Sequence, residues 1–475
     1  MKLRIKGVAA ASLMLSMVLG SGLDASARAK YVFYFIGDGM GMGHVNAAET
    51  YLRDVVKKGE GLLMLDFPVA SQVRTYSANS PITDSAAAGT ALSTGSKTNN
   101  HRIARSPEGE DLYSISRDFM RAGYEVGVAT TVAGDDATPA AFYAHADDRG
   151  QKEIITPMAV GSGLRFLGGG NFKGITDKEG NTTSWLDDMR ADGYVIVRGM
   201  QEFEALPTAP EKALMLSPMP QGDHVGYTID SIPGAMTCAD LTKACLETLI
   251  YNEKRDDAPG FFMMVEGGNI DWAAHANDGG AVIKEVLNFQ QAIDVAYKFY
   301  LEHPEETLIV VTADHDTGGM ALGRNDNKYS PRLALADYQK ISKDRFTDYC
   351  QANYAPGMKF SWEDMESFLK QNLGFWGGVR LTDEETADLR EAFDRTFVSR
   401  DATDERTWYK DFNLFSVKVY DIFNRYLGIG FTSSSHTGNF VPLYAVGEGA
   451  SLFQRNLDNT EIPRLILRAA GLGGE

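Results

Sequence analysis

Apolar runs recur along the chain, and most are followed closely by glycines and acidic residues. The runs are residues 31–36, 126–131, 261–265, 307–311 and 441–446. They lack the alternation of a half-exposed strand, so each predicts a strand buried on both faces of a parallel sheet. Helical patterns lie between them, for example at residues 279–300, where Val282, Val286 and Phe289 share one face. The alternation predicts an α/β fold with three layers, α/β/α, around a central, mostly parallel sheet.

The chain changes character between about residues 323 and 430, where aromatic residues and helical patterns replace the buried strands. Ser361 and Thr382 each precede an acidic residue by three positions, which is a capping-box signature of a helix start. We therefore predict a helical subdomain at 323–430, inserted within a catalytic domain that spans residues 30–475. It forms a lid over the site or a dimer contact, or its aromatic residues only pack its own core.

The first residues have the pattern of a secretory signal peptide. Three basic residues within the first six precede an apolar stretch, residues 8–19, which is too short to span a bilayer stably. Small residues that suit cleavage follow it. We therefore predict a signal peptide at residues 1–29 and a periplasmic or secreted protein. No cysteine follows the cleavage region and no later segment is apolar enough to cross a membrane, so we expect no membrane anchor.

The composition narrows the possible partners. With 44% hydrophobic and 23% charged residues, the 475-residue chain is typical of a folded soluble protein. A formal net charge of −18 disfavours binding to a nucleic-acid backbone. Any phosphate site must therefore be positive locally, through an arginine or bound metal ions. Cys238, Cys245 and Cys350 are too few for a disulfide framework, so we expect buried thiols.

Acidic side chains stand at the ends of four predicted strands. Asp38, Glu266 and Asp314 lie within three residues of apolar runs, and Asp136 follows the run at 126–131 after a short interval. In open α/β sheets, ligands gather beyond the carboxyl ends of the strands. We therefore expect these side chains to share one site, although a solvated loop aspartate is the alternative for Asp38.

Histidines near these strand ends indicate which ions could bind. Asp271 and His275 are four residues apart, so on a helix they share a face and can hold one cation. His315 directly follows Asp314, and such a pair suits a borderline-soft ion such as Zn²⁺. His436 is a lone histidine among small polar residues, but the last apolar run returns the chain to the sheet just after it.

A further segment offers oxygen ligands and one cation. Asp136 and Thr138 suit Mg²⁺, directly or through water. Pro139 lies in the first turn of a predicted helix that ends near Arg149. The Arg149 guanidinium can hold two phosphate oxygens. The alternative is that Thr138 caps the helix and Arg149 is an ordinary surface arginine.

The candidate nucleophile is Ser85. Thr83 or Asp84 can cap a helix that begins here, and the backbone N–H groups and helix dipole then favour an anion at Ser85. No histidine stands near Ser85 in the sequence to act as its base. We therefore infer that bound metal ions activate it toward phosphate. The alternative is an ordinary serine at a helix N-terminus.

Taken together, these motifs resemble those of the alkaline phosphatase family, in that family's order. The matching segments are Thr83-Asp84-Ser85-Ala86-Ala87, Asp136-Ala137-Thr138-Pro139-Ala140, Glu266-Gly267-Gly268-Asn269-Ile270-Asp271 with His275, Thr312-Ala313-Asp314-His315 and His436-Thr437-Gly438. The resemblance covers the chain from about Lys30 to its end, apart from the helical insertion. It implies a homodimeric enzyme that hydrolyses phosphate monoesters to an alcohol and inorganic phosphate, with two Zn²⁺ and one Mg²⁺.

The resemblance also implies what the site residues do. Ser85 resembles the nucleophile that becomes phosphoserine, and Arg149 resembles the clamp that holds phosphate. The ligands of the zinc that activates the hydrolytic water would be Asp271, His275 and His436.

The second zinc, which holds Ser85 as alkoxide, has its own set in this resemblance. Its ligands would be Asp38, Asp314 and His315. Asp38 would also bridge to a magnesium ion held by Thr138 and Glu266, with Asp136 in the water shell of that ion.

One position departs from the pattern of other members. Trp272 follows the predicted zinc ligand Asp271, where a lysine or histidine occurs elsewhere, so phosphate product could be held less tightly.

Two alternatives stay open for the function. One is a phosphodiesterase, sulfatase or phosphomutase on the same metal core, although the x-Pro-x-Arg pattern of sulfatases is absent after Ser85. The other is a non-catalytic protein that binds metal or phosphate.

Overall fold

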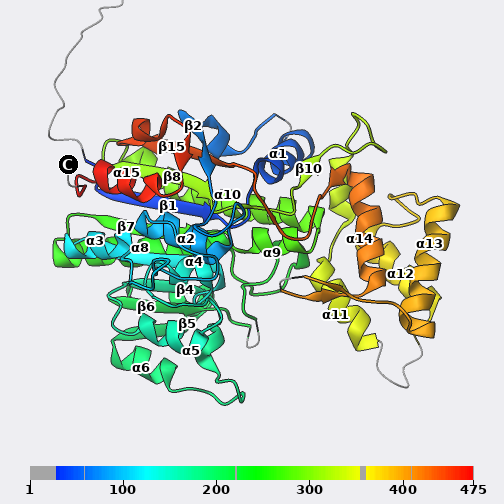
Figure 1. Cartoon of the computed structure of the whole chain (residues 1–475), viewed down its shortest axis with the longest axis horizontal. Helices are drawn as coiled ribbons and strands as arrows, with labels where there is room; N and C mark the ends of the chain where they lie inside the picture. The colour runs from blue at the N-terminus through cyan, green and yellow to red at the C-terminus, as the bar shows by residue number, and fades with distance from the viewer. Residues whose placement is uncertain (1–27, 58, 220–221, 354–359, 408, 474–475) are drawn as a thin grey trace, which may run out of the picture.

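The computed structural model describes residues 28–57, 59–219, 222–353, 360–407 and 409–473. Its body is a ten-stranded sheet covered by helices, with a helical group to one side (Figure 1). In spatial order the strands are β16 (Leu457–Asp458), β2 (Val69–Arg74), β15 (Val441–Gly447), β8 (Thr307–Ala313), β1 (Tyr31–Gly37), β7 (Phe261–Glu266), β3 (Glu125–Ala133), β4 (Phe166–Gly170), β6 (Lys212–Leu216) and β5 (Tyr194–Arg198). β15 runs antiparallel to both neighbours and the other pairs are parallel, which confirms the predicted mostly parallel sheet.

Side chains of β1 show how helices come to cover both faces. Phe33 and Phe35 point to one face, where their rings meet Phe299 and Phe289 of α10 (Gly279–Glu302). Tyr34 points to the other face, where its hydroxyl donates to a carbonyl of α2 (Ser85–Thr94) at 3.4 Å. Because successive strand residues alternate between faces, α10 and α2 lie in opposite layers. The three-layer prediction is therefore confirmed.

The remaining helices of the body complete these layers. They are α1 (Met42–Tyr51), α3 (Ile115–Arg121), α4 (Ala137–Ala140), α5 (Lys152–Ile155), α6 (Trp185–Ala191), α7 (Met200–Glu204), α8 (Cys238–Asp256), α9 (Asn269–His275) and α15 (Glu461–Ala469). α4 ends at Ala140, well before Arg149, so the longer helix predicted there is wrong. The chain instead forms a β-bridge between Ile103 and Ala146, and Ala140 to Ala146 turns to meet it.

Among its described residues, the segment at 323–430 contains the α-helices (yellow to orange in Figure 1) α11 (Lys343–Asn353), α12 (Trp362–Leu373), α13 (Asp383–Phe393) and α14 (Leu414–Leu427). Ser361 and Thr382 form the capping boxes that the sequence predicts. A short hairpin, β11 (Glu405–Arg406) with β12 (Asp411–Phe412), precedes α14. At its base, β10 (Ala321–Leu322) pairs with β13 (Ile429–Gly430), so the segment leaves and re-enters the body at one place. We refer to it below as the insertion.

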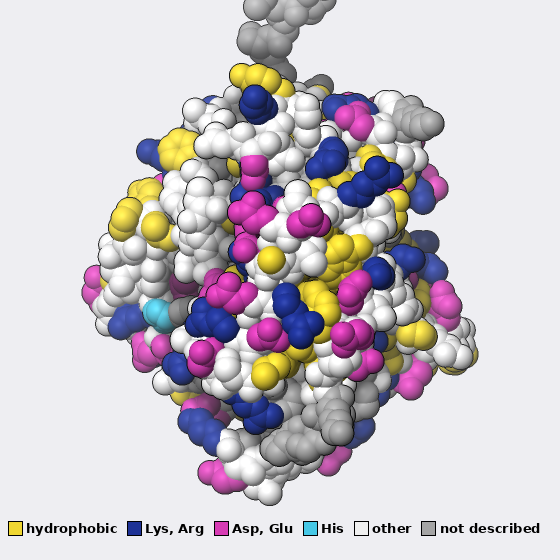
Figure 2. Space-filling model, turned by 90° about the vertical axis from the view of Figure 1, so that its right-hand side faces the viewer, with side chains coloured by type: hydrophobic (Ala, Val, Ile, Leu, Met, Phe, Trp, Pro, Cys, Tyr) yellow, Lys and Arg dark blue, Asp and Glu magenta, His cyan; other side chains and the backbone are white. Residues whose placement is uncertain are grey.

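The face on the insertion side carries basic and acidic side chains interspersed with one another (Figure 2). Cys238, Cys245 and Cys350 are buried free thiols, as predicted. None of the helices in the described residues is long and apolar enough to span a bilayer. Nearly all of the predicted signal peptide lies outside the described residues.

The aromatic core under the sheet can be tested at β7. Phe262 is fully buried, and its ring stacks on Phe119 with centroids 4.7 Å apart. Replacing Phe262 by alanine should lower the free energy of unfolding by about 3–5 kcal/mol, because it removes buried contacts and leaves a cavity. Phe440→Ala, at a side chain that is 50% exposed, is the control and should change it by less than about 0.5 kcal/mol. Equal effects in denaturant unfolding would contradict this view of the core.

Candidate active site

Neighbouring parallel strands end side by side at the edge where the acidic residues lie. Ile36 of β1 is in register with Glu266 of β7 on one side and with Thr312 of β8 on the other. Asp38 and Asp314 directly follow the last residues of β1 and β8. The sheet register therefore brings three carboxylates from distant parts of the chain to one place, as the strand-end pattern predicts.

One cluster joins Asp38, Asp314, His315 and Ser85. His315 Nε2 lies 3.3 Å from Asp38 Oδ1 and 3.2 Å from Asp314 Oδ2. Ser85 Oγ lies 3.1 Å from the same nitrogen. Asp84 caps α2, since its carboxylate accepts from the N–H of Ala87 at 3.0 Å, and this fixes Ser85 at the start of the helix. A buried serine hydroxyl at a helix N-terminus thus faces three potential metal ligands.

A second cluster contains Asp271, His275 and His436. Asp271 Oδ1 lies 3.4 Å from His275 Nε2 and 3.7 Å from His436 Nε2. The lone His436 reaches them because β14 (His436–Thr437) pairs with β9 (Asp316–Thr317), just beyond β8. Its ring stacks on that of His315 with centroids 3.6 Å apart, so the two clusters are adjacent.

These side chains form two groups of three that could each hold a metal ion. In each group the ligand atoms lie within 4.8 Å of one another; the groups are Asp38, Asp314 and His315, and Asp271, His315 and His436. His315 belongs to both groups, which differs from the ligand division implied by the family resemblance. His275 Nε2 stands 3.1 Å from His436 Nε2, at the side of the second group.

Each histidine is oriented through its other ring nitrogen. His275 Nδ1 lies 2.6 Å from the Ser434 carbonyl, His436 Nδ1 lies 2.8 Å from the Thr83 carbonyl, and His315 Nδ1 lies 3.1 Å from the Thr317 hydroxyl. Such contacts fix the tautomer and turn Nε2 toward the cluster, which is how metal-ligating histidines are usually held.

Asp136 lies in a ring of three cations. Its carboxylate is 3.2 Å from Arg149 Nη2, 3.8 Å from Lys152 Nζ and 3.4 Å from Lys173 Nζ. Burial acts to raise the pKa of Asp136, but the three cations outweigh it and hold that pKa well below its usual range. Arg149 also pairs with the capping Asp84 at 3.6 Å, so its guanidinium lies beside the N-terminus that carries Ser85.

Glu266 and Thr138 supply oxygen atoms nearby. Glu266 is buried and accepts a hydrogen bond from Thr130. The Thr138 hydroxyl is buried and has no hydrogen-bond partner among the described residues. Neither three-ligand group in the described part of the chain includes Glu266, Thr138 or Asp136, so the magnesium set stays a prediction.

Sequence reasoning missed Lys152, one of the cations around Asp136, and two further side chains at this site. Lys173, from a short 3-10 turn at Lys173–Ile175, places its ammonium 5.4 Å from the ring centroid of Trp272. It therefore brings a positive charge beside Trp272, the position where other family members carry a lysine or histidine. Tyr409, from the insertion, stacks on Trp272 at 4.6 Å and its hydroxyl accepts from Arg149 at 3.5 Å. No local pattern could have found either, because both positions depend on how distant segments pack.

The comparison with protein families fits this geometry. The family model described as "Alkaline phosphatase" matches residues 29–472. The chain belongs to the alkaline phosphatase family. It is 30% identical to "Alkaline phosphatase 3" of Bacillus subtilis over 96% of this chain and 94% of that protein. It is 27% identical to "Alkaline phosphatase" of Schizosaccharomyces pombe over 92% of this chain and 80% of that protein.

A solved structure agrees with the fold. The cold-active alkaline phosphatase of a psychrophilic Shewanella species superposes with a TM-score of 0.77 at 28% identity, covering 93% of this chain and 99% of that one. The chain is therefore an alkaline phosphatase, a phosphoric monoester hydrolase, of a family that depends on metal ions.

The side chains of this alkaline phosphatase fit bound cations. One buried carboxylate oxygen each of Asp38, Asp271 and Asp314 accepts no hydrogen bond from the described residues. Burial, with the neighbouring carboxylates, raises the pKa of Asp38 well above its ordinary value; burial likewise raises the pKa of Glu266 to about 8 and that of Asp314 to about 7. Burial and the other histidines lower the pKa of His315. Unpaired buried carboxylates beside neutral imidazoles are the donor set of a cation site.

Removal of metal should make the stability of this alkaline phosphatase fall with pH. Without cations, Asp314 and Glu266 have folded pKa values above their unfolded ones. For these two groups the unfolded state then binds fewer protons between about pH 4 and pH 8, so they make the metal-free protein lose stability as pH rises through that window. The buried His315 and His436, whose pKa values are lowered, act in the opposite direction only below about pH 6.5. The melting temperature of chelated protein should be lower at pH 8.5 than at pH 5.5.

Re-addition of Zn²⁺ and Mg²⁺ is the control, and it should raise the melting temperature most at pH 8.5, because the ions compensate the ionised carboxylates. A chelated protein whose melting temperature does not change between the two pH values would argue against this charge cluster.

Proposed function

We propose that this alkaline phosphatase transfers the phosphoryl group of a monoester to Ser85 and then hydrolyses the phosphoserine. The observation that carries the proposal is the position of Ser85 Oγ, at a helix N-terminus and 3.1 Å from His315 Nε2 within the first cluster. The N–H groups of α2 favour the phosphate oxygens there. A serine that served only as a structural residue would not need carboxylates and imidazoles of this kind around its hydroxyl.

The proposed metal content is two Zn²⁺ and one Mg²⁺. The zinc sets would be Asp38, Asp314 and His315, and Asp271, His275 and His436. The magnesium set would be Glu266, Thr138 and Asp38, with Asp136 acting through water. Nitrogen-containing sets suit zinc and all-oxygen sets suit magnesium, which supports this division. When bound, these ions would lower the pKa values of the serine hydroxyl and of water and would offset the charge of the phosphate.

The protein residues then position the reaction. Arg149 holds two phosphate oxygens, and Asp84 and Asp136 hold its guanidinium in place from two sides. The Ser85 hydroxyl loses its proton and Oγ attacks phosphorus from the side opposite the alcohol; the bond between phosphorus and the alcohol oxygen breaks, and that oxygen takes up a proton as the alcohol leaves. A water molecule next attacks the phosphoserine from the vacated side, which restores the Ser85 hydroxyl and releases inorganic phosphate.

Ser85→Ala should lower the turnover of a phosphate monoester by about three orders of magnitude or more, because it removes the nucleophile. Zinc content, measured by elemental analysis, should stay at the wild-type value, since Ser85 is not a proposed permanent ligand. Ser93→Ala is the matched control in the same helix, where the hydroxyl donates only to the Thr90 carbonyl. Unchanged turnover in Ser85→Ala would refute the proposed nucleophile.

We also propose that the mature enzyme is periplasmic or secreted and forms a homodimer. The basic start and short apolar stretch of residues 1–29 support export, and the family resemblance supports the dimer. Mass spectrometry of the protein from the exported fraction should give a chain that begins near residue 30, and light scattering should give twice that mass. A full-length chain retained in the cytoplasm would refute export. A monomer at working concentration would refute the homodimer.

A further inference from the structure

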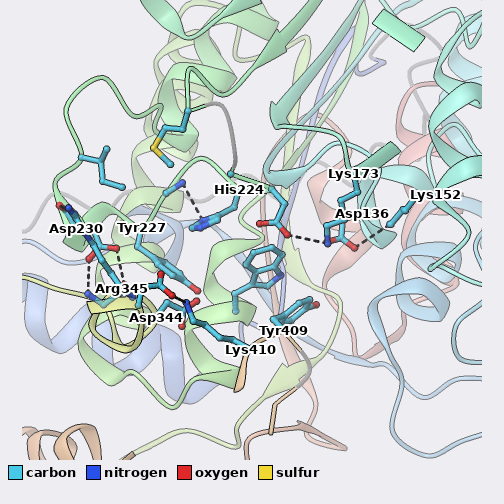
Figure 3. A pocket seen from close by; sticks show the side chains of 18 of the residues that line it. Asp136, Lys152, Lys173, His224, Tyr227, Asp230, Asp344, Arg345, Tyr409 and Lys410 are labelled. Carbon is cyan, nitrogen blue, oxygen red and sulfur yellow. Dashed lines mark hydrogen bonds and ion pairs between the residues drawn. The ribbon is translucent and has the colours of Figure 1, made fainter. Parts of the chain in front are cut away.

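A cavity of about 890 Å³ leads from the active site toward the insertion. Arg149, Asp136, Lys152 and Lys173 line the end beside the proposed phosphate site. At the other end Figure 3 shows Tyr227, Asp230 and Asp344 close together, the first two from the body and the last from α11 of the insertion. A cavity of this size and position can hold the alcohol part of a substrate whose phosphate lies at Ser85.

Aromatic rings connect the two ends of the cavity. From the metal cluster outward, centroid distances are 5.2 Å from His275 to Tyr409, 4.6 Å to Trp272, 5.2 Å to His224 and 5.0 Å to Tyr227. All but His275 line the cavity. A surface of this kind attracts flat or apolar groups, and the faces of Trp and Tyr rings also attract cations.

The acidic end contains one carboxylate that the protein leaves without a partner. Asp230 accepts from the Ser342 hydroxyl at 2.8 Å, and Lys410 pairs with Asp348 at 2.5 Å. Arg345 donates to the Asp230 carbonyl. Asp344 has no hydrogen bond and no ion pair with any described residue, although it lies in the wall of the cavity.

The hydroxyl of Tyr227 is a second, independent sign of a missing ligand. The residue is only 4% exposed, and its hydroxyl has no hydrogen-bond partner among the described residues. Buried polar groups are nearly always paired, so an unpaired hydroxyl in a cavity wall calls for a ligand. The Asp344 carboxylate is near enough to raise the pKa of Tyr227, after burial itself.

The charge on Asp344 indicates which ligand fits. Burial raises the pKa of Asp344 to about 7; Lys410 lowers it, and Asp278, Asp348 and Asp230 raise it further. The carboxylate is therefore ionised at alkaline pH without a paired cation. A neutral polyol could satisfy the Tyr227 hydroxyl but would not compensate this charge, whereas an ammonium or guanidinium group would do both.

We propose that the cavity is a leaving-group subsite for phosphate monoesters whose alcohol carries a cationic amino or guanidino group, which binds to Asp344 and the Tyr227 hydroxyl. The uncharged part of the alcohol lies along the aromatic row. The proposal rests on the phosphomonoesterase function proposed above. It means that the insertion, through Asp344 and Tyr409, helps to select the substrate.

Matched substrates of increasing length test the proposal. ω-Aminoalkyl phosphates and ω-hydroxyalkyl phosphates of equal chain length are compared at pH 8, where the amine is protonated. At the length that reaches Asp344, kcat/KM should be about tenfold higher for the amine, mainly through KM, because a charge-assisted hydrogen bond replaces a neutral one. Shorter amines should show no preference.

Asp344→Asn should reduce this ratio of amine to alcohol to about one, and Tyr227→Phe should lower kcat/KM for that amine about threefold. Asp388→Asn, which removes the same charge from α13 where it pairs with Lys418, should keep the wild-type ratio and the basal activity. Asp344→Asn should melt at or above the wild-type temperature at pH 8, because a half-buried unpaired carboxylate is lost.

No preference for the amine at any length, or a preference that persists in Asp344→Asn, would overturn the subsite. If Asp344→Asn does not fold, an unchanged kcat/KM for the long amine in Tyr227→Phe overturns it, since that variant removes only an unpaired hydroxyl. If the proposed phosphomonoesterase function itself were wrong, neither the aminoalkyl nor the hydroxyalkyl phosphates would be hydrolysed, which distinguishes that outcome from failure of the subsite.

Discussion

The architecture of this site depends on the repulsion between carboxylates that the sheet forces together. β1, β7 and β8 end in register, so Asp38, Glu266 and Asp314 leave them into one small buried volume. Charged oxygens placed so closely out of water destabilise the fold unless cations lie among them. His315 and His436 supply neutral nitrogen donors rather than positive charge, because burial lowers their pKa values. The same side chains that the fold must neutralise are therefore those that can gather the ions of a phosphatase.

The basic side chains of the site lie beside the carboxylate cluster, around Asp136, and not within it. Arg149, Lys152 and Lys173 surround Asp136, which balances part of their charge and limits where they can point. Since the whole chain has a net charge of −18, this local group is what makes the entrance acceptable to a phosphate ester. Lys173 comes from the body, while Tyr409 reaches the same corner from the insertion, so both parts of the molecule shape the approach to Arg149.

Sequence patterns were most informative where a residue sits next to a long, regular element. The buried runs predicted the strands of the centre of the sheet, and the residues at their ends led directly to Asp38, Glu266, Asp314 and His315. The ordered motifs also led to the family and the activity. The helix predicted to reach Arg149 was wrong, because Ile103, far away in sequence, pairs with Ala146 and draws the chain out of a helix.

Lys173, Tyr409 and Asp344 could not be found from sequence for a related reason. Each lies in a segment without a distinctive local pattern, and each reaches the cavity only because of tertiary packing. The division of ligands between ions is equally beyond pattern reasoning, since His315 is shared by both three-ligand groups.

The short pairing of β14 with β9 has a consequence for biosynthesis. It holds His436 beside Asp271 and His315, although the whole insertion separates that histidine from β9 in the chain. A ribosome must therefore complete nearly the entire polypeptide before the ion-binding set can close. A truncated chain would carry the crowded carboxylates without their last imidazole, so full metal capture needs nearly the whole polypeptide.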